Sequence, residues 1–438
     1  MKIYIQTTNG TPSEEVLIKS QTHRAENKLS KHKFLKCKSC GSDALAEYIN
    51  FGQNPISTNY KSMPADVHVT YKLSIAICGR CATVQLFDHI PESELTSPPT
   101  WIHYNEPELH LDAVVSELIE FIDSASPRVR GLSYKDQSTI TRLERLGYKD
   151  GQVYDFSLNR RYDHPVNIER LQNLVTSKNC SIIKSIQGEA DVLLVRHVLE
   201  HTFNTFEFLA GIKTLVSSGA TIIFEVPDCS KQFENQDYTC LWEEHTIYFV
   251  KNTFEKLLEI NGFTLENSFV YEYATENSLV AICKVNEEFN TTVAYELQTD
   301  THDYQNGLFD FKNKFNDIGA SVHNVILKKT QQGQIVIFGA GHLSITFIHL
   351  FNLKNLIDFV IDDDPNKCGK FIPGTNIEIR TSKSLVTEKV ETCFLSLSPE
   401  TEAKLLSKKK DIFQNIPNVK SIFPGKENSI LWSDDHGN

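Results

Sequence analysis

The stretch that decides the fold is DVLLVRHVLEH at residues 191–201, in which an unbroken apolar run ends directly on charged and imidazole side chains. Such short apolar runs are typical of strands that are buried on both faces of a parallel sheet. Ligands of these sheets bind just beyond the carboxyl ends of the strands. The sequence therefore predicts a ligand site beside Arg196, His197, Glu200 and His201. A histidine in such a place is also often only a hydrogen-bonded structural group.

Strands and helices alternate on either side of this stretch. The expected strands are residues 129–133, 153–156, 181–186, 192–195 and 221–226, with helices that run through Leu143, Leu171 and Phe208. This α/β alternation predicts a mainly parallel sheet with helices on both faces. A helix at 253–259 and two strand-like runs at 264–273 and 278–284 then add an antiparallel end to the sheet.

The first two strands of this segment carry candidate residues for a nucleoside cofactor. Gly131, Ser133 and Asp136 follow the first strand, and Asp155 lies about 20 residues further on, near the end of the second. A glycine turn that admits a ligand, followed at this spacing by a carboxylate for ribose hydroxyls, is typical of a nucleotide-binding βαβ unit. The loop is irregular, because Lys135 stands where small, flexible residues are usual.

Four of the ten cysteines form two CxxC pairs, Cys37 with Cys40 and Cys78 with Cys81. Four thiolates satisfy tetrahedral zinc and leave no position for water or substrate, so the predicted role of this Zn²⁺ is structural. A redox CxxC and incidental cysteines are the alternatives, although redox motifs usually occur singly. The six scattered cysteines fit a reducing compartment better than a disulfide framework.

The paired cysteines lie in a small module, residues 34–100. Short β-like runs at 71–77 and 83–87 surround them, and residues 52–55 have the composition of a turn. The module has little apolar material, so we expect the metal to supply part of its folding energy. Residues 1–33 are a polar N-terminal extension to which we assign no chemistry.

A second α/β segment occupies the C-terminal part of the chain. Its first strand runs into the loop of residues 339–344, and its next strand ends on Asp362. Gly341 and His342 are placed to seat a phosphate at a helix N-terminus, and Asp362 to bind a ribose. Alone, these features would support a nicotinamide-dependent oxidoreductase. The three-glycine fingerprint is incomplete, because Ser344 stands in the place of the third glycine.

Bulk composition limits the classes of partner. A chain of 438 residues suits two or three domains. The net charge of -12 argues against general nucleic-acid binding, which needs clustered lysine and arginine. No apolar run approaches a membrane span and the first residues lack a signal-peptide core, so we expect a cytoplasmic protein without a membrane partner. The sequence carries no signal for an oligomeric state.

Five motifs, in order and spacing, resemble the S-adenosylmethionine-dependent sugar C-methyltransferases. They are residues 52–55 with 59–60, residues 195–201, 225–228 and 244–249, and residues 362–367 with 369 and 373–375. The resemblance covers about residues 34 to 425, and it implies a zinc-binding domain, a class I methyltransferase domain and a C-terminal Rossmann-like domain. The implied boundaries are an extension at 1–33, the zinc-binding domain at 34–100, the methyltransferase domain at 101–286 and the C-terminal domain at 287–438.

The resemblance implies methyl transfer from S-adenosylmethionine to the carbon beside the ketone of a 4-keto deoxy sugar on a nucleoside diphosphate. His245 is then the expected base that forms the enolate, with Glu244 to orient it, and Tyr104 or His103 is placed to steady the enolate. The expected cofactor-binding residues are Gly131, Ser133, Asp136, Asp155, Arg196 and His197. The expected substrate-binding residues are His201, Asp228, Tyr248, Gly341, His342, Asp362 and Lys367.

Two departures from the family pattern leave an alternative open. Trp242 stands where the family commonly has a tyrosine, and residues 101–108 differ from the usual aromatic and serine-rich segment. Together with the irregular loop near Lys135, they suit either a branch with a different acceptor or a protein that binds a nucleotide sugar without turnover.

Overall fold

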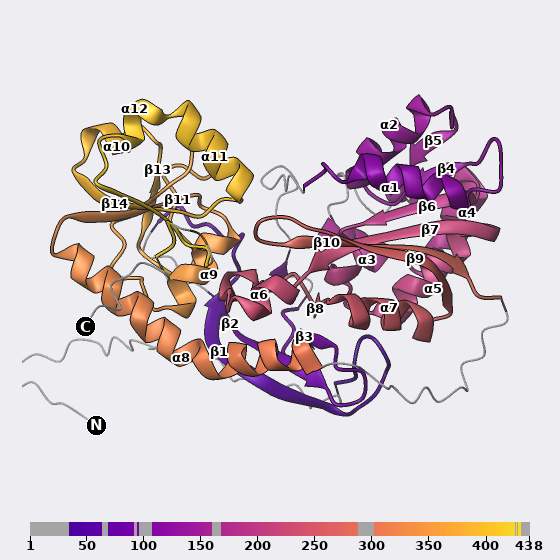
Figure 1. The fold of residues 1–438 in the computed structure, drawn as a ribbon, viewed down its shortest axis with the longest axis horizontal. Helices are drawn as coiled ribbons and strands as arrows, with labels where there is room; N and C mark the ends of the chain where they lie inside the picture. Colours follow the sequence, from indigo (N-terminus) through magenta and orange to yellow (C-terminus); the bar gives the residue numbers. More distant parts are fainter. Residues whose placement is uncertain are drawn as a thin grey trace, which may run out of the picture. The chain divides into compact units, whose positions relative to one another are not determined.

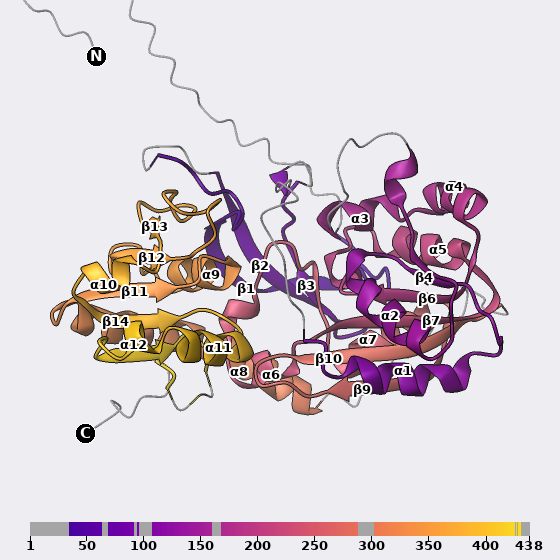
Figure 2. The same cartoon turned by 90° about the horizontal axis from the view of Figure 1, so that it is seen from above.

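The computed structural model describes residues 35–63, 69–91, 94–95, 107–159, 168–287, 302–424, 426 and 428–430. These residues form three sheets with their helices (Figure 1; Figure 2 gives the view from above). The extension at 1–33 lies outside them. Of the helices in the described ranges, none combines the length and the apolar character that a membrane span requires.

The cysteine-containing module forms an antiparallel sheet. Its strands, in sheet order, are β1 (Leu45–Pro55), β2 (Thr70–Cys78) and β3 (Val84–Leu86), and β8 (Ile247–Tyr248), from later in the chain, adds a fourth strand beside β3. The turn expected at 52–55 was wrong, because these residues continue β1. Gly52, with a φ of 83°, lies where the register of β1 against β2 shifts between Asn50 and Gln53. A glycine inside a strand often marks such a bulge.

The middle sheet has the order β5-β4-β6-β7-β10-β9. Its strands are β4 (Val129–Gly131), β5 (Gly151–Val153), β6 (Ala190–Arg196), β7 (Val216–Asp228), β9 (Phe263–Tyr271) and β10 (Asn277–Val285). The first four strands in this order are parallel, while β10 is antiparallel to both β7 and β9. The mainly parallel sheet with an antiparallel end is therefore confirmed.

Helices cover both faces of the middle sheet (Figure 1). They are α1 (Leu111–Leu118), α2 (Gln137–Arg145), α3 (Ile168–Leu174), α4 (Ser177–Gln187), α5 (Thr205–Leu215) and α7 (Lys251–Ile260). The short helix α6 (Ser230–Glu234) follows β7 and buries Phe233 in a different core. Short 3-10 helices are η2 (Ile119–Phe121), η3 (Tyr134–Asp136), η4 (Phe156–Asn159), η5 (Leu199–His201) and η6 (Tyr238–Cys240). In β6, Val192 and Leu194 pack with α1 and α2, whereas Leu193 and Val195 pack on the opposite face. This two-sided burial explains the unbroken apolar run.

One predicted strand, residues 181–186, is wrong. It forms part of α4, which begins after Thr176 and ends before Gly188. The Thr176 side chain accepts a hydrogen bond from the backbone N–H of Asn179, and Gly188 has a φ of 80°, so cap residues define both ends. Within α4 only Cys180 and Ile183 are buried, at helical spacing. The second strand also ends earlier than expected, at Val153.

The C-terminal segment is a second Rossmann-like unit, as predicted. After α8 (His302–Thr330), five parallel strands take the order β13-β12-β11-β14-β15. They are β11 (Gln334–Phe338), β12 (Phe359–Ile361), β13 (Glu378–Arg380), β14 (Val390–Leu395) and β15 (Asn418–Ser421). The helices are α9 (His342–Leu350), α10 (Ser384–Thr387), α11 (Pro399–Lys408) and α12 (Lys410–Phe413). Helices α8 and α9 cover one face and α10 to α12 the other.

Candidate functional site

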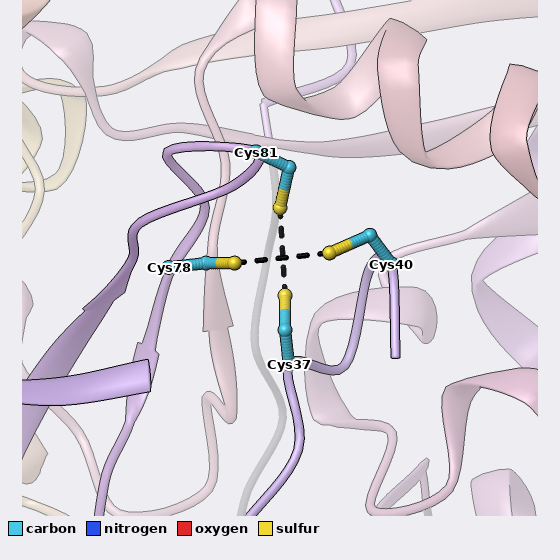
Figure 3. A group of neighbouring side chains, drawn as sticks. All are labelled: Cys37, Cys40, Cys78 and Cys81. Carbon is cyan, nitrogen blue, oxygen red and sulfur yellow. Dashed lines mark hydrogen bonds between the residues drawn. The ribbon is translucent and has the colours of Figure 1, made fainter. Parts of the chain in front are cut away.

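The four paired cysteines come together at the end of the small sheet. Their Sγ atoms lie within 4.8 Å of one another and point toward a common centre (Figure 3). The Sγ atoms of Cys37 and Cys81 are 3.5 Å apart, and those of Cys40 and Cys78 are 3.7 Å apart. Tetrahedral zinc with Zn–S bonds of about 2.3 Å separates its sulfur ligands by about 3.8 Å, so the cluster fits this ion. All ten cysteines are free of disulfides.

The zinc-binding module contacts the segment that follows His201. The Nζ of Lys38 donates to the backbone carbonyls of Thr202, at 3.0 Å, and Phe203, at 2.7 Å. Strand β8, only two residues after His245 in the chain, pairs with β3 of the module. The structural metal site is therefore built directly against both histidine-bearing segments.

The carboxyl ends of β4, β5 and β6 meet at one edge of the middle sheet. Gly131 pairs with Val153 on one side and with Leu194 on the other. Asp155 follows β5 at this edge, Arg196 is the last residue of β6, and His197 follows it. The chain thus brings its candidate cofactor-binding residues to one place, where parallel sheets bind their ligands.

A carboxylate closes the loop after β4. The Oδ2 of Asp136 accepts hydrogen bonds from the backbone N–H groups of Leu132 and Ser133, each at 2.8 Å. A Cβ at Gly131 would lie 2.6 Å from the Cβ of Asp136, so this close packing requires glycine. Burial raises the pKa of Asp136 to about 7, although Arg196 and the two amides oppose the rise. The two loop amides therefore bind a side chain of the same loop.

Asp155 remains exposed at the same edge. Its Oδ1 accepts hydrogen bonds from the backbone N–H of Ser157, at 2.9 Å, and from the Ser157 hydroxyl, at 2.6 Å. Its backbone N–H donates to the Gln187 side chain at the end of α4. These bonds fix the position of a solvent-facing carboxylate, which fits the hydroxyls of a ribose.

Glu225 is the centre of a buried charged network under this edge. Its carboxylate accepts hydrogen bonds from Arg196 at 2.5 Å, His197 at 3.1 Å and Ser278 at 3.0 Å, and its Oε1 lies 3.0 Å from the Nε2 of His110. Burial alone would raise the pKa of Glu225, but Arg196 and the imidazole hydrogen bonds hold it well below its usual value. Arg196 and His197, expected at a cofactor, thus bind this internal carboxylate.

A group of imidazole and indole rings lies beyond the end of β6. The ring centroids of His201 and His245 are 4.7 Å apart at 86°, and Trp242 lies 4.8 Å from His245. The same indole stacks on His342, at 4.5 Å and 18°. His342 begins α9 of the C-terminal domain, so the loop that bears His245 meets the predicted phosphate loop. Glu200 is buried beside His201 and His197.

The loop that carries Glu244 and His245 is held by residues far away in the chain. The Trp242 indole N–H donates to the Ser57 hydroxyl at 3.0 Å. Ser57 in turn donates through its backbone N–H, at 2.6 Å, and its hydroxyl, at 2.7 Å, to the Oε1 of Glu243. Burial raises the pKa of Glu243 while these bonds oppose the rise.

The C-terminal loop is organised by Asp362. Its Oδ2 accepts from the backbone N–H of Ala340, at 3.0 Å, and from the Nζ of Lys367, at 3.1 Å. The hydroxyl of Tyr60 donates to the Ala340 carbonyl at 2.5 Å. A Cβ added to Gly341 would have no other atom within 4 Å, so this residue faces open space. Asp362 and Lys367 therefore shape the loop, while Gly341 and His342 lie at its accessible tip.

Two further candidates bind neighbouring chain segments. Both oxygens of Asp228 accept hydrogen bonds, from Ser230 and Asn277. The buried hydroxyl of Tyr248 accepts from the backbone N–H of Trp242 and donates to its carbonyl. Burial raises the pKa of Tyr248 well above its usual value. The other two candidates, His103 and Tyr104, lie outside the described residues.

Sequence reasoning missed four residues that hold these loops. They are Lys38, Ser57, His110 and Glu243. Their contacts are long-range, so no local pattern identifies them. Ser57 lies between the two parts of the motif at residues 52–55 and 59–60, but is not itself one of the motif residues.

Two domain families match the chain. The family described as "C-methyltransferase C-terminal domain" matches residues 274–424, and that described as "Putative zinc binding domain" matches residues 37–95. The chain therefore contains one segment that matches a C-methyltransferase domain family and one that matches a zinc-binding domain family. The second match contains all four clustered cysteines, in agreement with the zinc ion predicted from their spacing.

The chain is similar to a C-methyltransferase over most of its length and to solved methyltransferases over part of it. The C-methyltransferase NovU of Streptomyces niveus is 20% identical over 401 residues, which are 87% of this chain and 93% of that protein. A solved O-methyltransferase family protein from Burkholderia thailandensis is 16% identical, covers 41% of this chain and 57% of its own, and has a TM-score of 0.28. Magnesium protoporphyrin IX methyltransferase from Synechocystis PCC 6803, solved with bound SAH, is 13% identical, covers 40% and 82%, and has a TM-score of 0.28.

Proposed function

We propose that this protein transfers a methyl group from S-adenosylmethionine to a carbon of a nucleotide-linked keto deoxy sugar. The observation that carries the proposal is the ring contact between two domains. His245 lies against Trp242, and Trp242 stacks on His342 at the tip of the C-terminal loop. A substrate whose nucleotide binds at that loop would have its sugar near His245.

His245 is the proposed base. It is partly exposed, unlike the buried Glu200 and His201 beside it, so a substrate can reach its ring. Removal of the proton beside the ketone creates an enolate, which needs a base near neutral pKa. The backbone N–H of His245 donates to the Trp242 carbonyl at 3.2 Å, and that of Thr246 to the Glu200 carbonyl at 2.7 Å. These bonds hold the imidazole in place, and positioning contributes most to a reaction of this kind.

Asp155 would bind the ribose of S-adenosylmethionine, which supplies the methyl group. Its exposed carboxylate lies at the edge where β4, β5 and β6 end. At the other end of the site, Gly341 and the first amides of α9 would take the phosphates of the sugar nucleotide.

Transfer of isotope-labelled methyl to a set of nucleoside-diphosphate 4-keto deoxy sugars tests the proposal. The wild-type protein should label one of them at carbon, and His245→Asn should abolish labelling and solvent deuterium exchange while leaving calorimetric S-adenosylmethionine binding unchanged. Asp155→Ala should weaken that binding by at least about tenfold, the effect of losing roughly 1.4 kcal/mol. Asp150→Ala, at the amino end of β5, is the matched control and should bind normally. Binding that is equally strong in the Asp155 variant would contradict the assignment.

One observation favours a second candidate, a protein that binds the sugar nucleotide without turnover. The amides of Leu132 and Ser133 already bind Asp136, so the loop after β4 has fewer donors for a ligand. This candidate predicts no heat of S-adenosylmethionine binding but retained affinity for a nucleoside diphosphate. Any labelled methylated product would exclude it.

A further inference from the structure

Glu200, His201 and His245 form a second group with the donor atoms of a metal site. Each residue offers one nitrogen or carboxylate oxygen, and these atoms lie within 4.8 Å of one another. Two imidazole nitrogens and one carboxylate oxygen are a common donor set of zinc sites that keep a fourth position open. The group is unlike the cysteine cluster, whose four thiolates leave no open position.

The carboxylate in this group has an unsatisfied oxygen. Glu200 is 2% exposed, and its Oε2 has no hydrogen-bond partner among the residues that the structure describes. Its Oε1 lies 3.6 Å from the Nδ1 of His197 and 3.9 Å from the Nε2 of His201. A buried carboxylate oxygen without a partner is costly, and a bound cation would offset that cost.

The backbone holds the three ligands in place before any ion arrives. Glu200 and His201 are neighbours on η5, and the N–H of Thr246, next to His245, donates to the Glu200 carbonyl at 2.7 Å. Trp242 packs against both imidazoles, at 5.8 Å from His201 and 4.8 Å from His245. His245 is only partly buried, which gives an ion a way in.

We infer that Glu200, His201 and His245 bind a divalent transition-metal ion of the Zn²⁺ type, and that this ion inhibits the protein. The inhibitory effect rests on the proposed function. A nitrogen of His245 that is bonded to metal has no lone pair with which to take the substrate proton. The ion and the reaction therefore compete for the same imidazole, and metal binding at this site would inhibit methyl transfer.

Cobalt titration of the full chain, with zinc already in the cysteine cluster, tests the site without any measurement of activity. The wild-type protein should bind one Co²⁺ with visible d–d absorption and without the near-ultraviolet thiolate bands that would report the cysteine cluster. His245→Asn and Glu200→Gln should each weaken Co²⁺ binding by more than roughly 10- to 100-fold. That range is the loss caused by removing a residue that only hydrogen-bonds to a metal ligand. His323→Asn, in α8 and away from the group, is the matched control and should bind as the wild type does.

The inference is overturned if the wild-type protein binds no second ion, or if the two ligand variants bind it as tightly as the His323 variant. Two site variants are used because one of them could fail to fold, which circular dichroism would reveal. If labelled methyl transfer is seen, added Zn²⁺ should inhibit it and a chelator of moderate strength should restore it. Cobalt binding without any transfer would contradict the proposed function and leave the metal site in place.

Discussion

The indole of Trp242 donates its N–H to the hydroxyl of Ser57 across 3.0 Å, although 185 residues separate the two in the chain. Ser57 also donates twice to Glu243, the next residue after Trp242. One serine of the zinc-binding module thus fixes two side chains of the loop that carries His245. The module is a support for the proposed catalytic loop, which gives its structural metal a functional consequence.

We predict that Ser57→Ala slows methyl transfer without weakening cofactor binding. The substitution removes the acceptor for the Trp242 indole and one donor to the buried Glu243 carboxylate. Loss of a buried hydrogen-bond partner costs about 1–3 kcal/mol, so urea unfolding should show a decrease of that size. A displaced base can reduce kcat by up to about 100-fold. The S-adenosylmethionine affinity, measured by calorimetry, should stay the same.

Ser116→Ala is the control for this substitution. The exposed Ser116 hydroxyl donates within α1 to the Asp112 carbonyl. It should leave both stability and kcat unchanged. Equal kcat values for the two variants would show that the Ser57 contacts do not position the loop.

We predict that Lys38→Met destabilises the protein and disturbs the segment after His201. Lys38 is 7% exposed, and its ammonium donates to the carbonyls of Thr202 and Phe203. Methionine fills much of the same volume but leaves both carbonyls without their donor, so the free energy of unfolding should fall by roughly 1–3 kcal/mol. Lys36→Met is the matched control, since Lys36 is exposed on the other side of Cys37. If both variants unfold at the same urea concentration, the Lys38 contacts contribute nothing.

We predict that loss of zinc from the cysteine cluster abolishes transfer. Cys81→Ser should reduce bound zinc, measured by elemental analysis, and lower the melting temperature, because a structural zinc ion contributes directly to folding. Transfer should be lost with it, since β3 of the module pairs with β8. Cys368→Ser is the control, because Cys368 donates to the Asp362 carbonyl outside the cluster and serine can do the same. A Cys81 variant with full zinc content would contradict the assignment.

The sequence predicted features that depend on local spacing. The paired cysteines needed only their CxxC separation, and the run at 191–201 needed only its apolar residues and the polar ones that follow. The parallel order of β4, β5 and β6 then placed Asp155 and His197 at one edge without further information. Where the local pattern was ambiguous, as at 181–186, the cap residues Thr176 and Gly188 decided for a helix.

The roles of individual polar side chains were harder to predict, because each depends on a partner distant in the sequence. Arg196 has the position of a ligand-binding residue, yet its guanidinium binds Glu225, 29 residues away. Asp228 likewise bonds Asn277, which is 49 residues away. The hydrophobic periodicity of the sequence does not predict such side-chain pairs. They appear only when the strands that carry them are brought together.

The last prediction concerns pH and the carboxylate of Asp136. Burial raises the pKa of Asp136 from 3.8 to about 7, so between these values the folded protein holds a proton that the unfolded chain has released. The contribution of Asp136 to the free energy of unfolding is therefore fully present below about pH 4 and falls as the pH rises from about 4 to 7. Above about pH 7 it no longer changes. Asp136→Asn removes this titration, while its amide oxygen can still accept from Leu132 and Ser133.

Urea unfolding at pH 5 and pH 8 measures the effect. Glu225, whose pKa is lowered well below its usual value, is ionised in both the folded and the unfolded protein over this range, so it does not contribute to the change. As the pH rises from 5 to 8, the wild type should therefore lose unfolding free energy that the Asp136→Asn variant keeps, so the variant becomes more stable relative to the wild type. Asp123→Asn, at an exposed carboxylate, should show no such shift. A difference that is independent of pH would mean that Asp136 is ionised in the folded protein throughout this range, held so by Arg196.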